Sequence, residues 1–177
     1  MMRNYIYLLI LTLISCGSQK TLIRMSDQMM KDHLRTKNII IINEPSDQGL
    51  LTAIKDKYEY YKDYNTSPIY LTVGDTLKRI FSEKNLASFQ EQLNKQIPWS
   101  EKPYVKQTII DKKDRNKYRE EIIFSFSHPV ITRDKKYALM QSSSYHQLYM
   151  VGSNELLIFK KQKNKWVVYK RFELFSH

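Results

Sequence analysis

Two stretches of the sequence place serine hydroxyls beside histidine imidazoles, as a serine hydrolase requires. The first is Ser127-His128, and the second runs from Ser142 through Ser144 to His146. In such an enzyme the histidine removes the hydroxyl proton, and a carboxylate orients the histidine. Neither stretch has the glycines of a nucleophile elbow. Adjacent residues of a strand also point to opposite faces, so Ser127 and His128 would diverge there.

On these observations we assign no catalytic residue. A small Ser–His hydrolase remains the enzymatic alternative, with Ser127, His128 and His146 as candidate functional residues on the protein surface. Such a hydrolase would need one of the serines within hydrogen-bonding distance of a histidine in a pocket.

The other chemistry-bearing residues predict no metal and no cofactor. A zinc site uses three or four nitrogen, sulfur or oxygen ligands, but no two histidines share a helix face and Cys16 is the only cysteine. A phosphate-binding loop needs clustered glycines before a helix, whereas the glycines here stand alone. The residues considered are His33, His128, His146 and His177, with Gly17, Gly49, Gly74 and Gly152.

The N-terminal segment has the layout of a secretory signal. Arg3 supplies one positive charge, and an almost wholly apolar run extends from Tyr5 to Ile14. A membrane-spanning helix needs about 20 apolar residues, so this run is too short to be one. It ends in the residues Leu-Ile-Ser-Cys at positions 13–16, which resemble the lipobox of bacterial lipoproteins.

The resemblance implies cleavage between Ser15 and Cys16 and attachment of a diacylglycerol to the Cys16 thiol. We therefore expect a signal peptide at residues 1–15, a lipidated tether at 16–24 and a single domain at 25–177, held to a membrane through Cys16. Gly17 stands where an aspartate often retains lipoproteins at the inner membrane. The expected location is thus the cell envelope, at the outer membrane of a Gram-negative bacterium.

Composition limits the classes of partner that the mature chain is expected to bind. Removing residues 1–15 leaves 162 residues, which suits one domain, and lowers the net charge from +11 to +10. A basic protein attracts polyanions, and export makes nucleic acid an unsuitable partner. The alternative is that the two densest basic runs, 112–117 and 160–165, are solvated turns. With Cys16 lipidated, no cysteine is left for an internal disulfide.

Hydrophobic spacing and turn residues predict an α+β fold in which N-terminal helices pack on a C-terminal antiparallel β-meander. Trp166, Val168, Phe172 and Leu174 are expected on one face of the last strand, with Lys170 breaking the alternation. Tyr61 should pack inward and Tyr60 should lie on the surface. The expected helices are 26–35, one that begins at 46–47, and 76–96, the last in two pieces with a restart near Ser82. A strand buried on both faces is expected at 38–43. The other expected strands are 69–73, 105–110, 121–127, 136–145, 155–161 and 165–174.

A second resemblance covers about fifty residues of the C-terminal part. The pattern begins with Ser127, Pro129 and Asp134, continues through Tyr-Ala-Leu at 137–139, and closes with Lys165-Trp166. It is similar to small uncharacterised envelope proteins of Gram-negative bacteria. The resemblance supports the meander and implies no activity. We read Pro129 as the end of one strand and Asp134 as a turn residue.

Three hypotheses for function remain. The first is a lipid-anchored, non-catalytic envelope module that binds a protein or an anionic envelope polymer. The second is the Ser–His hydrolase, and the third is an immunity or inhibitor lipoprotein with one tight protein partner. The three differ in whether a serine and a histidine meet in a pocket and in what the exposed surface offers to a partner.

Overall fold

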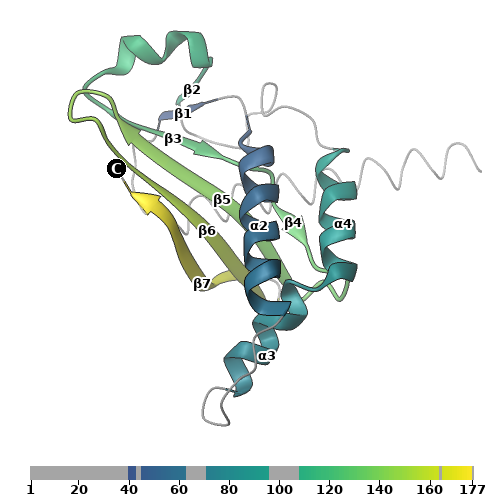
Figure 1. Ribbon diagram of the computed structural model, residues 1–177. Helices are drawn as coiled ribbons and strands as arrows, with labels where there is room; N and C mark the ends of the chain where they lie inside the picture. The colour runs from purple at the N-terminus through teal and green to yellow at the C-terminus, as the bar shows by residue number, and fades with distance from the viewer. Residues whose placement is uncertain (1–39, 43–44, 63–70, 96–107, 164, 177) are drawn as a thin grey trace, which may run out of the picture.

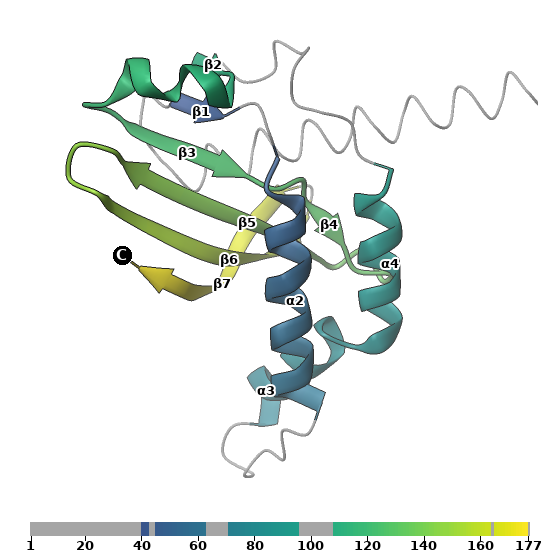
Figure 2. The same cartoon turned by 45° about the horizontal axis from the view of Figure 1, so that its top comes forward.

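The structure is a computed structural model that describes residues 40–42, 45–62, 71–95, 108–163 and 165–176. Helices α2 (Asp47–Lys62), α3 (Leu71–Ile80) and α4 (Glu83–Leu93) precede most of the sheet in the chain. They pack against one side of it (Figures 1 and 2). The fold is a single α+β domain, as the sequence predicted.

The sheet is mostly antiparallel. Its order is β2-β1-β3-β5-β6-β7, with β4 paired to β5. Strands β3, β5, β6 and β7 form the predicted antiparallel meander, whereas β1 runs parallel to both β2 and β3. The bounds are β1 Ile40–Ile42, β2 Thr108–Ile110, β3 Ile122–Phe126, β4 Val130–Ile131, β5 Tyr137–His146, β6 Val151–Gln162 and β7 Lys165–Ser176, with a 3-10 helix, η2, at Lys112–Tyr118.

Both faces of the sheet are buried at its centre. On β6, Leu156 and Ile158 pack with the helices, while Leu157 and Phe159 belong to a second cluster on the other face. All four side chains are fully buried. Alternation of side chains along a strand explains this division. It also explains why this stretch is continuously apolar, since a strand buried on both sides has no polar face.

A β-bulge changes the face that β7 presents. Ile158 is opposite Lys170 and Phe159 is opposite Val168, so Tyr169 is an extra residue on β7. Trp166 and Val168 therefore join the second cluster. Residues beyond the bulge, Phe172 among them, turn toward the helices. The prediction that Trp166, Val168, Phe172 and Leu174 share one face is wrong because of this bulge, which lies next to Lys170.

Two further predictions need correction. Residues 71–73 begin helix α3 and are not a strand. Burial of Leu77, Ile80 and Phe81 against α2 and the sheet outweighs the strand preference of this segment, because tertiary packing overrides local propensity. In β1 only Ile41 is buried, while Ile40 and Ile42 are half-buried.

The remaining helical predictions are confirmed where the structure describes them. The restart near Ser82 is the N-cap of α4. Tyr61 is buried and Tyr60 is exposed. The expected signal peptide, tether and helix 26–35 lie outside the described residues. No helix in the described part of the chain has the length and apolar character needed to cross a membrane.

Candidate functional site

Ser127 and His128 lie where β3 leaves β5 and the chain enters β4. Asp47, in the first turn of α2, meets them there: its carboxylate accepts the backbone N–H of His128 at 2.7 Å and lies 2.8 Å from the His128 Nδ1. The backbone N–H of Ser46 also donates to the carbonyl of Phe126. Helix α2 and strands β3 and β4 thus meet at one place. We call the side chains of Asp47, Ser127 and His128 there the polar joint.

The geometry at Ser127 differs from that of a nucleophile. Its Oγ donates to the carbonyl of His128 at 3.1 Å and accepts the backbone N–H of Gln141 at 2.8 Å. Ser127 is fully buried, and His128 is 6% exposed. The prediction that these two residues lie on the surface is wrong. Pro129 has no N–H and interrupts the pairing, so the polar side chains instead satisfy backbone groups that the sheet leaves unpaired.

A second set of polar side chains extends this joint across the sheet. Gln141 Nε2 donates to Asn154 Oδ1 at 2.7 Å, and Ser143 Oγ donates to the same oxygen at 3.2 Å. Gln141 lies so close to α2 that a Cβ at Gly49 would come within 2.5 Å of Gln141 Oε1. Gly49 therefore permits the close approach of helix and sheet, which accounts for a glycine within a helix.

The other serine and histidine candidates are not brought together as a pair. Ser144 Oγ lies 2.9 Å from Ser153 Oγ across β5 and β6. His146 lies at the end of β5, where its Nδ1 accepts the backbone N–H of Tyr149 at 3.5 Å and its ring contacts the Tyr149 ring. The structure thus supplies His128 with a carboxylate, Asp47, whereas the Ser127, Ser143 and Ser144 hydroxyls bond to other groups.

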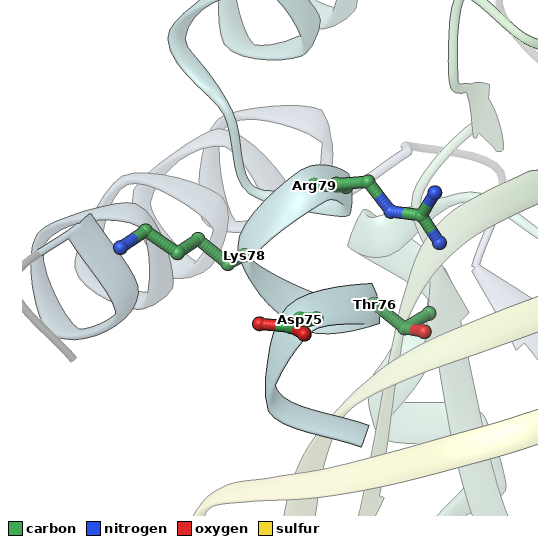
Figure 3. Close-up of a pocket in the computed structure, with 4 residues that line it drawn as sticks. All are labelled: Asp75, Thr76, Lys78 and Arg79. Atoms are coloured by element: carbon green, nitrogen blue, oxygen red, sulfur yellow. The ribbon is translucent and has the colours of Figure 1, made fainter. Parts of the chain in front are cut away.

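In the part of the chain that the structure describes, neither the hollow on α3 nor a metal cluster offers an alternative centre. One shallow hollow on α3 is lined by Asp75, Thr76, Lys78 and Arg79. Figure 3 shows the Lys78 and Arg79 side chains extending in opposite directions, so their charged ends do not converge on a ligand. Among the residues that the structure describes, no three histidine, cysteine or acidic side chains lie close enough to hold a metal.

The loop of the β5–β6 hairpin carries an exposed apolar surface that the sequence analysis missed. Six large hydrophobic side chains of the described residues are strongly exposed, and five of them gather at this end of the sheet. We call these five the apolar tip: Ile122, Leu148, Tyr149, Met150 and Val151, exposed by 51%, 59%, 69%, 73% and 51%.

Strand register holds the apolar tip together. Ile122 is opposite His146, and His146 is opposite Val151, so these three side chains lie in one row across β3, β5 and β6. The backbone N–H of Leu148 donates to the carbonyl of Arg119 at 3.2 Å, which ties the loop to the segment before β3. The sequence signal was the charge-free stretch 137–154 in a chain that is 27% charged.

At its opposite end, β6 enters a strongly basic hairpin. Between Leu156 and Phe172 the sequence has six cations and no carboxylate. We call this the basic hairpin, and its cationic residues, all exposed, are Lys160, Lys161, Lys163, Lys165, Lys170 and Arg171.

Comparison with protein-family models, curated proteins and solved structures finds no match to this chain.

Proposed function

We propose that the protein is a lipid-anchored envelope protein whose folded domain binds an anionic envelope polymer through the basic hairpin, without catalysing a reaction. The anchor in this proposal is Cys16, and the location is the outer membrane of a Gram-negative bacterium. The residues at positions 13–16 and the basic composition support it. The observation that carries the binding function is the concentration of six exposed cations without an acid on β6 and β7.

The cations of the basic hairpin differ from those of η2. In η2 and the residue before it, Lys113 lies 3.3 Å from Asp111 and Lys117 lies 2.7 Å from Asp114. The hydrogen bond from Lys117 lowers the pKa of Asp114, so that carboxylate is ionised. In the basic hairpin no acid lies between the lysines, and a polyanion would meet a field of one sign.

Two ammonium groups of the basic hairpin lie over aromatic rings. The Lys160 Nζ lies 6.0 Å from the centre of the Tyr169 ring, and the Lys161 Nζ lies 5.9 Å from that of Trp166. At these distances a cation is attracted to the face of the ring, and both lysines remain exposed. These contacts leave the charges accessible to phosphate, sulfate or carboxylate groups of a polymer.

The binding test uses the full chain with Cys16→Ser, so that lipid does not contribute, and dextran sulfate as the anionic probe. Replacing Lys160, Lys161 and Lys163 together by Gln should weaken binding roughly tenfold or more, with the effect shrinking as salt screens the charges. The matched control replaces Lys112, Lys113 and Lys117 by Gln, an equal change in charge.

The outcomes are distinct. Equal losses in the two triple variants would mean that net charge alone drives association, and the basic hairpin would not be a site. Binding of neutral dextran as tightly as dextran sulfate would also contradict the proposal. A single tight protein partner and no polymer binding would favour the immunity or inhibitor hypothesis instead.

A hydrolase is disfavoured by the contacts of Ser127. Its Oγ is buried and already engaged by two backbone groups, whereas a nucleophile must reach both a base and a substrate. The carboxylate that orients His128 serves the polar joint between α2 and the sheet.

A further inference from the structure

We propose that the apolar tip inserts into the interfacial region of a phospholipid membrane, so that the hairpin is a second membrane contact besides the lipid on Cys16. The inference goes beyond polymer binding and depends on the proposed function only in placing the protein beside a membrane. Its test uses a chain that lacks Cys16, so the failure of one proposal is distinguishable from the failure of the other.

The shape and position of the apolar tip suit a membrane surface. The β5–β6 hairpin projects at the end of the sheet away from α3 and α4 (Figures 1 and 2). A projecting loop fits a fluid interface without a matching groove. Exposed apolar groups gathered in one place on a soluble domain mark an interaction surface, and aliphatic side chains with a tyrosine are suited to the boundary between headgroups and acyl chains.

The charges around the apolar tip are arranged for such an interface. The stretch from Tyr137 to Asn154 has no acidic or basic residue apart from His146, so insertion of the loop would desolvate no full charge. Cations lie at its base instead. The Arg115 guanidinium carbon is 4.2 Å from the centre of the Tyr145 ring, and the Arg119 carbonyl holds Leu148.

An arginine at this level, such as Arg115, can reach lipid phosphates while the apolar side chains enter the acyl boundary. The neighbouring acids Asp111 and Asp114 are each within salt-bridge distance of a lysine. Glu120 and Glu121 are exposed on the segment that leads into β3. Over residues 111–121 five cations stand against four carboxylates, so the base of the tip has a net charge of +1 while the tip itself is neutral. The cation that the structure places beside the tip is Arg115, over the Tyr145 ring.

The backbone of Met150 supplies a separate observation. Its φ is 53°, in the left-handed region that glycine and asparagine adopt more readily. The turn thus holds a residue that is unfavourable for its conformation and leaves its side chain 73% exposed. Lys135 and Lys163 adopt the same conformation in two other turns, so what distinguishes Met150 is an exposed apolar side chain at such a position. Insertion of the thioether into a membrane would account for that side chain.

Insertion of the apolar tip would orient the domain. The basic hairpin lies at the other end of β6, so it would face away from the membrane that the apolar tip enters. The two surfaces could then act together, one on the bilayer and one on a polymer beyond it.

The first experiment uses the only cysteine of the chain. A chain that begins at residue 16, as the expected mature protein does, lacks the apolar run 5–14, and Cys16→Ser makes it cysteine-free. Met150→Cys then carries an environment-sensitive fluorophore. Vesicles of phosphatidylethanolamine and phosphatidylglycerol should shift its emission to the blue, even in 0.5 M NaCl, where the Debye length is about 4 Å. The control places the label at Tyr60→Cys, on α2, a strongly exposed hydrophobic residue outside the apolar tip. No shift at position 150, or equal shifts at both positions, would overturn the proposal.

The second experiment separates folding from insertion. Met150→Asn should raise the midpoint of urea unfolding, because asparagine tolerates the left-handed conformation better, and should weaken vesicle sedimentation roughly tenfold. Lys135→Asn is the control, because Lys135 has a φ of 57° in another turn. This variant should not lower the unfolding midpoint and should leave vesicle binding unchanged. Sedimentation of Met150→Asn as strong as that of the parent would contradict insertion, and so would an equal loss in Lys135→Asn.

Discussion

Asp47 accepts two hydrogen bonds from His128, one from the backbone N–H at 2.7 Å and one at the ring Nδ1 at 2.8 Å. The two residues are 81 positions apart in the sequence. Asp47 begins α2, and His128 lies just beyond β3. The pair therefore fixes the start of the longest described helix against the point where the sheet changes partners.

Replacing Asp47 by Ala should lower the free energy of unfolding by about 2–3 kcal/mol, because the N–H of His128 loses its acceptor in a poorly hydrated site. Asp47→Asn retains an acceptor and should cost less. Asp56→Ala, exposed on the same helix, should stay within about 0.5 kcal/mol. Urea denaturation measures all three. An Asp47→Ala loss no larger than that of Asp56→Ala would mean that the joint contributes nothing to stability.

A serine-reactive fluorophosphonate probe should not label the purified full chain. Ser127 Oγ is buried and engaged by backbone groups. The Ser143 and Ser144 hydroxyls bond to Asn154 and Ser153. Intact-mass analysis reads the result directly. Stoichiometric labelling that disappears in Ser127→Ala or Ser143→Ala would instead make the hydrolase the leading hypothesis.

Cys16→Ser should abolish lipid attachment, because the thiol is the acceptor of the diacylglycerol, and should leave the precursor uncleaved before residue 16. Mass spectrometry of the membrane fraction distinguishes the acylated mature protein from the precursor. An unmutated mature protein that starts at Cys16 without acyl mass would refute the anchor. Retention of the Cys16→Ser chain on vesicles through the apolar tip would leave this prediction intact.

Trp166→Ala should lower the free energy of unfolding by about 3–5 kcal/mol, as large-to-small substitutions in a core do. The ring is buried on the sheet face opposite the helices, in the cluster that contains Leu157 and Phe159. Equilibrium denaturation provides the measurement. A loss below about 1 kcal/mol would indicate that the site relaxes to fill the cavity or that the ring contributes little there.

Gln92 of α4 completes the free edge of β4. Its side-chain amide donates to the carbonyl of Ile131 and accepts the N–H of the same residue, both at 2.8 Å. Gln92→Met keeps the shape but leaves both backbone groups unpaired, and should cost about 1–3 kcal/mol. Gln90→Met, exposed on the same helix, is the control. Equal denaturation midpoints for the two variants would contradict this role.

Local sequence patterns were sufficient for the class of fold and for much of the meander. Apolar residues at helical spacing identified the second helix, and the restart at Ser82 separated the next two. Turn residues between apolar stretches separated the last strands, because short connections favour antiparallel pairing. These features depend on neighbours in the chain, and a sequence displays them directly.

The tertiary structure alone decided the features that depend on residues far apart. Nothing near Asp47 or His128 indicates that they meet, since their pairing follows from how α2 docks on the sheet. The bulge at Tyr169 reverses the faces of β7, and only the register with β6 reveals it. The structure likewise shows that Ser127 is buried and bonded to backbone groups, although the sequence had made it a candidate nucleophile. Strand register places Ile122 beside Val151 at the apolar tip. Each outcome is set by contacts across the sheet, which the periodicity of one segment does not contain.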